Sequence, residues 1–131
     1  RVMNDNTSTR PAVASITQAE IEDGKMMAIL AYIFFLVPLL AARDKKFAMY
    51  HTEQAIALWI AFILIYIVIT ILTIIVNQIS STLGCVVSIL GILPWLAYVV
   101  LWIMGLMNAI GGKIKELPLI GAWGAKLNLV K

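Results

Sequence analysis

Charged residues, cysteine and histidine are all scarce in this sequence. Only 13% of its 131 residues are Asp, Glu, Lys or Arg, against about 25% in a typical soluble domain. Cys85 is the only cysteine and His51 the only histidine, so neither a disulfide within the chain nor a cysteine-based zinc or iron–sulfur site can form. No GxSxG, P-loop or HExxH pattern is present either. We therefore expect no catalytic, cofactor or metal residues, no cofactor and no enzyme activity.

Arg/Lys-rich runs interleaved with aromatic residues are also missing, which argues against a nucleic-acid partner. What the chain has instead is apolar sequence: 62% of its residues are hydrophobic and the mean hydropathy is +0.95. These residues lie in three uncharged blocks, 26–42, 54–76 and 83–110. A soluble protein of this size would have to expose them. The composition predicts an all-α integral membrane protein whose first partner is the lipid bilayer, because backbone hydrogen bonds in lipid must close within each helix.

The three blocks predict a three-helix transmembrane bundle. A span needs about 20 residues, with a lower limit near 17, so the first block is marginal and a re-entrant segment is its alternative. Pro38 near the end of this block could kink or finish the helix. In the third block Gly91 and Pro94 indicate a hinge, which leaves either one kinked helix or a short segment before the true span.

The predicted domain boundaries follow from these blocks. Residues 1–16 read as a flexible polar tail, 17–124 as the transmembrane domain with helices at about 18–42, 48–77 and 83–111, and 125–131 as a basic C-terminal tail. Thr17 followed three residues later by Glu20 is a capping-box pattern, which predicts that the first helix starts near Gln18. The charged segment 43–53 is expected to be a loop leading into the second helix.

The distribution of Lys and Arg predicts the orientation, because short cytoplasmic loops carry an excess of both. With three spans, segment 43–53 and the C-terminal tail carry most of the basic residues and share one side. With a re-entrant first block, all ten basic residues lie on one side, opposite the uncharged turn 77–81. Both arrangements put the C-terminus on the cytoplasmic side. The membrane is expected to be a bacterial inner membrane or one derived from it.

Small and aromatic residues recur along one face of the third block. Small residues let membrane helices approach closely, and the seven-residue repeat matches left-handed packing. This face either packs on the second helix of the same chain or forms an interface with other subunits or a homo-oligomer. Its members are Gly84, Ser88, Gly91, Trp95, Tyr98, Trp102 and Gly105.

A second predicted surface is polar and basic and faces the cytoplasm. Near an anionic leaflet each Lys or Arg contributes about 1 kcal/mol of binding, so this surface would meet anionic lipid or an acidic partner. Within it, His51 and Gln54 share a helix face and read either as an interfacial cap or as transport chemistry. The surface comprises Arg43, Lys45, Lys46, His51, Gln54, Lys113 and Lys115.

Several short motifs occur in a recognisable order: Val37-Pro38-Leu39-Leu40, Arg43-Asp44, His51-Thr52-Glu53-Gln54-Ala55 with Leu58-Trp59, and Leu117-Pro118-Leu119-Ile120-Gly121. Over roughly residues 25–124 the chain resembles the Tic-twenty-like family, which includes MamF/MmsF-like magnetosome membrane proteins. Tyr32 stands where many members have His. The resemblance implies three or four helices, no known enzymatic activity, and a role as scaffold, assembly factor or accessory subunit.

Two function classes follow. The first is a non-enzymatic membrane interaction protein, acting as a scaffold, assembly factor or accessory subunit of a larger complex. The alternative is a small oligomeric channel or protein-translocation component, lined by the polar stripe of the second helix at Gln54, Tyr66, Thr70, Thr73 and Asn77.

Overall fold

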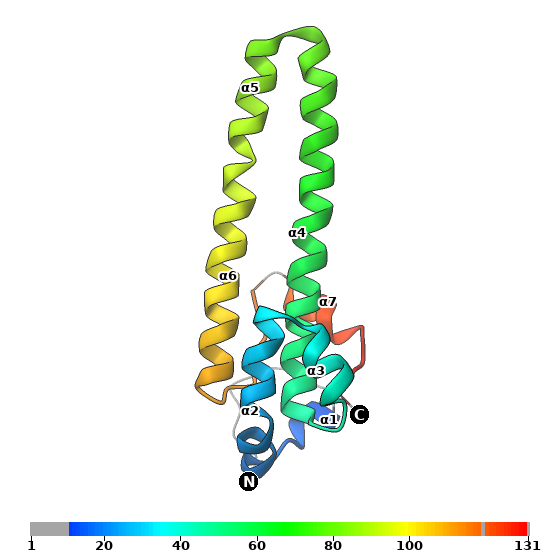
Figure 1. Ribbon diagram of the computed structural model, residues 1–131, viewed down its shortest axis with the longest axis vertical. Helices are drawn as coiled ribbons and strands as arrows, with labels where there is room; N and C mark the ends of the chain where they lie inside the picture. The colour runs from blue at the N-terminus through cyan, green and yellow to red at the C-terminus, as the bar shows by residue number, and fades with distance from the viewer. Residues whose placement is uncertain (1–10, 119, 131) are drawn as a thin grey trace.

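The computed structural model describes residues 11–118 and 120–130. Its regular elements are helices: α1 (Pro11–Ala14), α2 (Gln18–Ile33), α3 (Leu36–Ala41), α4 (Lys46–Ile79), α5 (Ser81–Leu90), α6 (Ile92–Ile110) and α7 (Gly121–Ala125). Figure 1 shows two parts. A head at one end consists of α1, α2, α3, α7 and the first turns of α4. A stalk, the hairpin of α4 with α5 and α6, extends from it.

Within the described residues, two helical stretches are long and apolar enough to cross a membrane, Lys46–Ile79 and Ser81–Ile110. Both form the stalk. Along α4 the first turns are buried by the head, whereas most side chains from Trp59 onward are exposed. Exposed aliphatic side chains in such numbers suit lipid rather than water. The prediction of an all-helical membrane protein agrees with this arrangement. A third span is not confirmed, because the first apolar block is divided between α2 and α3.

Two prolines explain where the apolar blocks break. Proline has no N–H to give to the carbonyl four residues earlier, and its ring clashes with that carbonyl. Four residues before Pro38 is Phe34, where α2 ends, and the Phe34 carbonyl accepts from the Val37 N–H instead, at 3.1 Å. Pro38 and Pro94 are each the third residue of the helix after the break, a position whose N–H is free in any helix.

In the third block the break lies at Gly91, between α5 and α6. It is one turn before Pro94, as expected for a hinge, and the two helices continue in nearly the same direction (Figure 1). The Tyr66 hydroxyl donates to the Gly91 carbonyl, which ties α4 to the break from across the hairpin.

The predicted start of α2 is confirmed. Thr17 caps the helix through a capping box: its hydroxyl accepts from the Glu20 N–H at 3.2 Å, and the Glu20 carboxylate accepts from the Thr17 N–H at 2.9 Å. That second bond is the main reason why the pKa of Glu20 lies below its usual value. Helix α4 begins at Lys46, so most of the segment expected to be a loop, from residue 46 to residue 53, is helical.

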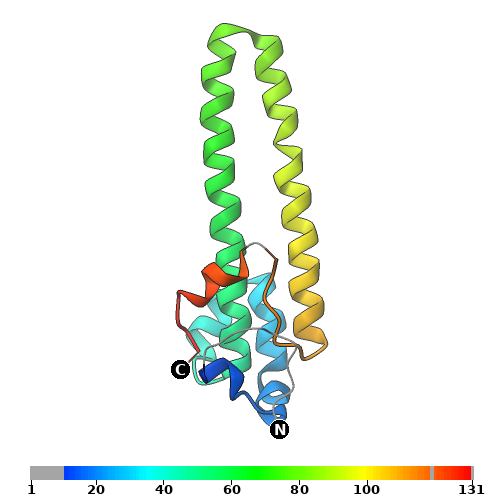
Figure 2. The same ribbon diagram turned by 180° about the vertical axis from the view of Figure 1, so that it is seen from behind.

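Both predicted tails differ from expectation where the structure describes them. Residues 11–14 form α1, and Val13 and Ile16 are fully buried in the head core; residues 1–10 of the predicted flexible tail lie outside the described part. At the other end Val130 is buried. The head core draws apolar side chains from α1, α2, α4 and the segment after α6, so both ends of the described chain are held in it (Figure 2).

Candidate functional site

Four consecutive polar residues of α4, His51 to Gln54, are 0% exposed. Successive residues of a helix are about 100° apart, so four in a row point to all sides. Their burial therefore requires protein on every side of α4. Figure 2 shows how this is achieved: the segment from 111 to 130, with α7, wraps the side of α4 opposite α2.

His51 connects three segments of the head. Its Nε2 lies 2.9 Å from the Lys113 carbonyl oxygen, and its Nδ1 lies 2.7 Å from the Tyr32 hydroxyl. A carbonyl can only accept, so Nε2 donates, and in the neutral ring Nδ1 then accepts from Tyr32. The rings of Phe47 and Tyr50 pack edge-on against the imidazole. His51 thus holds α2 and the segment just after α6 against α4.

Gln54 holds the Leu-Pro-Leu-Ile-Gly turn. Its amide nitrogen donates to the Gly121 carbonyl at 3.1 Å, and its amide oxygen accepts from the Leu117 N–H at 2.9 Å. A Cβ at Gly121 would lie 2.7 Å from the Gln54 Oε1, so only glycine permits this approach. Two motifs of the family resemblance that lie more than sixty residues apart in the sequence are therefore direct partners.

Glu53 anchors the chain after α7. Its Oε2 accepts from the N–H groups of Leu129 and Val130 at 2.7 and 3.3 Å. A Cβ on Gly124 would lie 2.6 Å from the Glu53 carbonyl, so α7 rests directly on the backbone of α4. Together His51, Glu53 and Gln54 form what we call the buried latch, which fastens the C-terminal segment at three successive points.

The buried latch corrects the prediction of a cytoplasmic polar surface for two of its members. His51 and Gln54 are fully buried rather than surface residues, because α2 and the C-terminal segment cover this part of α4. Sequence reasoning had grouped Glu53 with His51 and Gln54 at the start of the second helix, but it did not place Tyr32 beside His51. The local signal was a run of four adjacent polar residues, His51 to Gln54, and such a run fits an exposed helix entry equally well.

The basic residues divide into two groups. On one side of the head, Lys45 and Lys46 pair with Asp23 and Glu20 of α2, at 2.8 and 3.7 Å. The bond to Asp23 is the main cause of the raised pKa of Lys45. Among the residues that the structure describes, the other predicted cations have no carboxylate partner: Arg43, Lys113 and Lys115.

The small and aromatic face of the third block turns inward, onto the same chain. Gly105 receives the Tyr32 ring, and a Cβ there would lie 2.4 Å from it. The Trp102 indole nitrogen donates to the Tyr32 carbonyl at 2.7 Å, and the Tyr98 ring packs on Phe62.

Farther along the stalk, Gly84 lies against Asn77 and Gly91 faces Tyr66. Ser88 and Trp95 line a cavity of about 410 Å³ between the stalk helices, together with Thr70 and Thr73. Of the predicted polar stripe of α4, Tyr66, Thr70 and Thr73 line this cavity, whereas Gln54 and Asn77 do not. The Thr73 hydroxyl donates to the Ile69 carbonyl of its own helix.

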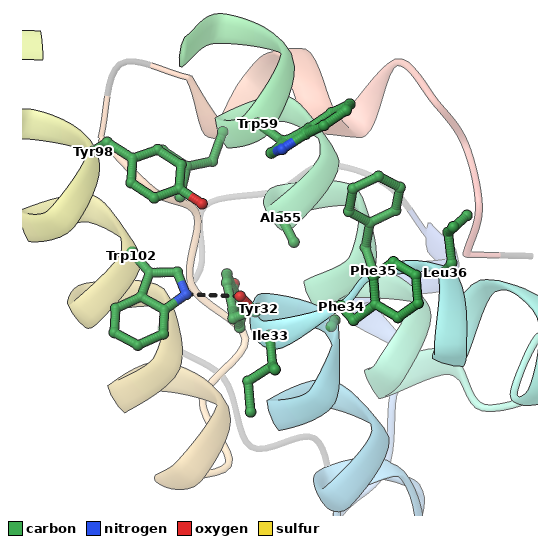
Figure 3. A pocket seen from close by; sticks show the side chains of 11 residues that line it. Tyr32, Ile33, Phe34, Phe35, Leu36, Ala55, Trp59, Tyr98 and Trp102 are labelled. Atoms are coloured by element: carbon green, nitrogen blue, oxygen red, sulfur yellow. Dashed lines mark hydrogen bonds between the residues drawn. The ribbon is translucent and has the colours of Figure 1, made fainter. Parts of the chain in front are cut away.

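A second cavity, of about 250 Å³, lies where head and stalk meet (Figure 3). Its walls are aromatic and come from the end of α2, from α4 and from α6. Across the part of the chain with described side chains, no three His, Cys, Asp or Glu residues are grouped to hold a metal ion.

A comparison with protein-family models assigns these features to a family. Residues 23–124 match the MamF/MmsF model, described as the magnetosome magnetite crystal formation protein family. The chain belongs to this family. As a MamF/MmsF protein it is a magnetosome membrane protein involved in crystal formation. The matched range runs from α2 through Gly124, so it contains the buried latch and the whole stalk.

This result confirms the narrower part of the predicted resemblance, whereas the broader Tic-twenty-like relationship stays a prediction. Comparison with curated proteins found no match, and comparison with solved structures found none either.

Proposed function

We propose that this MamF/MmsF protein is a non-enzymatic scaffold or assembly subunit of the magnetosome membrane. The observation that carries the proposal is the buried latch: the side chains best suited to chemistry, His51 and Glu53, are fully buried and bind backbone groups of their own chain. Their role is to close the head. The outer surface of the head carries cations that have no carboxylate partner among the described residues. Such a surface suits binding of an acidic partner or of anionic lipid.

The orientation follows from the charges. Residues 54–110 carry no Lys, Arg, Asp or Glu, and the described charged residues lie at the head end of the hairpin. The positive-inside rule then places the head and the C-terminus in the cytoplasm. Lys113 and Lys115, just after α6, would meet anionic headgroups or an acidic partner, as the sequence predicts.

Complementation of a strain that lacks the protein tests the scaffold role. We expect His51→Gln, which retains a donor for the Lys113 carbonyl, to restore crystal number and size when it reaches wild-type amounts in the membrane. We expect the double variant Lys113→Glu, Lys115→Glu to fail at equal amounts, and Lys113→Arg, Lys115→Arg to succeed. Loss of crystals with a folded, abundant His51→Gln protein would point to chemistry at His51 instead.

A small channel is the second candidate, and the cavity lined by Thr70, Thr73 and Ser88 favours it. A pore would need several copies, because this cavity lies between only two helices. Substitution of Thr70 and Thr73 by Val separates the two functions. A channel predicts lost flux with intact complexes, whereas a scaffold predicts unchanged crystals.

A further inference from the structure

The aromatic cavity at the junction of head and stalk has features of a ligand site. It lies above the end of α2, between α4 and α6, and six of its lining residues are aromatic: Tyr32, Phe34, Phe35, Trp59, Tyr98 and Trp102. Its volume of about 250 Å³ is near the lower end for small-molecule pockets. A cavity of this size takes part of a ligand whose remainder lies outside it.

Two hydrogen-bond donors in this cavity are unused. Figure 3 shows the Tyr98 hydroxyl and the Trp59 indole nitrogen directed toward the space in front of Ala55. The Trp102 N–H in the same wall is already taken by the Tyr32 carbonyl. Within the described chain, neither the Tyr98 hydroxyl nor the Trp59 N–H has a hydrogen-bond partner. The missing partner is therefore an acceptor.

The electrostatic field at the floor of the cavity indicates which kind of acceptor can bind. Tyr32, Ile33 and Phe34 at the C-terminal end of α2 form part of the lining. The C-terminal end of a helix carries partial negative charge, which disfavours a phosphate or carboxylate. A neutral carbonyl oxygen can accept from either donor without opposing this field.

The depth of the cavity in the membrane also favours a ligand with a neutral carbonyl oxygen. From Trp59 to Ile79, α4 is mostly exposed, and at 1.5 Å per residue this part is about 30 Å long, the thickness of the hydrocarbon core. Trp59 therefore lies at the boundary nearest the head, where Trp and Tyr are enriched and where the ester groups of membrane lipids are found.

We propose that this cavity binds the ester region of a membrane glycerolipid, with the Tyr98 hydroxyl and the Trp59 N–H donating to an ester carbonyl and one acyl chain leaving along the stalk. The inference depends on membrane insertion and not on the scaffold role, so either can fail without the other.

The test uses the full-length protein, purified in detergent and stripped of lipid, with native mass spectrometry as the readout. The two probes are dioleoyl phosphatidylethanolamine and its dialkyl ether analogue, which has the same headgroup but no ester carbonyls. We expect the wild-type protein to retain the diester roughly three- to tenfold better, as one or two hydrogen bonds predict.

Tyr98→Phe keeps the ring and removes one donor, and we expect it to lose most of the preference for the diester; Trp59→Phe should reduce the preference as well. Tyr66→Phe is the matched control: it also removes a stalk hydroxyl, but Tyr66 lines the other cavity and should leave the preference unchanged. Ala55→Leu should fill the cavity and lower retention of both lipids at unchanged helicity. Equal retention of diester and ether by the wild-type protein, or an undiminished preference in Tyr98→Phe, would overturn the assignment.

Discussion

At the scale of single residues, Gln54 shows why a polar side chain can be essential inside an apolar protein. The turn from Leu117 to Gly121 buries an N–H and a carbonyl that it cannot pair within itself, and one amide side chain satisfies both. A buried polar group without a partner costs about 1–3 kcal/mol. The position of Gln54 is therefore dictated by a segment more than sixty residues away.

Substitution of Gln54 by Leu should lower the free energy of unfolding by about 2–4 kcal/mol, because both backbone groups of the turn lose their partner. Denaturant titration in detergent, followed by circular dichroism, measures the change. Gln78→Leu is the matched control, since Gln78 is exposed at the far end of α4; its effect should stay within about 0.5 kcal/mol. Equal effects of the two substitutions would contradict the role given to Gln54.

At the scale of elements, α2 depends on its first turn and on its contact with α6. The capping box lowers the pKa of Glu20, chiefly through the hydrogen bond from the Thr17 N–H. A carboxyl whose pKa is lower in the folded state adds stability above its unfolded pKa, and this contribution is lost as the pH falls through the folded value. Acid should therefore loosen α2 from its N-terminus.

The pH dependence of Glu20 can be isolated by substitution. The free energy of unfolding should fall less between neutral and acidic pH in Glu20→Gln than in the wild-type protein. Thr17→Ala should lower the free energy of unfolding by about 1 kcal/mol at neutral pH. Unfolding measured across pH 3 to 7 gives both values. Glu22→Gln is the control, because Glu22 is exposed and lies outside the capping box; a change equal to that of Glu20→Gln would rule out the cap as the cause.

The contact between α2 and α6 depends on the absence of a side chain at Gly105. Gly105→Ala would place a Cβ 2.4 Å from the Tyr32 ring, and overpacking of this kind costs about 1–3 kcal/mol. Since Tyr32 is also bound to His51, the ring cannot move freely. In Gly111→Ala, at the residue that caps the end of the same helix, the nearest atom is 3.2 Å away, so this control should be milder. A Gly105→Ala protein as stable as the control would show that α6 can move aside.

Much of this element-level structure could be predicted from sequence, because its causes are local. The capping box marks the start of α2, and long uncharged runs mark the stalk. The break at Phe34 was missed although Pro38 was noted, since the effect of proline falls four residues upstream. The buried latch could not be predicted from local patterns, because His51, Glu53 and Gln54 look like a helix entry until the C-terminal segment is placed over them.

At the scale of the whole molecule, the hairpin and the charge distribution make one orientation testable. Cys85 is exposed in α5, at the end of the stalk away from the head. The variant Cys85→Ser, Ser81→Cys moves the thiol to the exposed start of α5 beside the turn. With intact magnetosomes, a membrane-impermeant maleimide should leave this thiol unlabelled until the membrane is opened. In Cys85→Ser, Ala122→Cys, the thiol lies in α7 of the head, at an exposed position, and should be labelled at once. The reverse pattern would invert the proposed orientation.

The protein has a different cross-sectional area at the two ends of the hairpin, and this affects the bilayer. In the leaflet at the turn, the chain contributes only the hairpin of α4 and α5. At the head end, the bend between α2 and α3 lies beside the hairpin and adds exposed apolar side chains, with Ile33 and Phe34 64% and 53% exposed. One leaflet must therefore make room for a wider cross-section than the other. Each copy inserted adds to this difference in area, so the protein's abundance is coupled to the balance of lipid between the two leaflets.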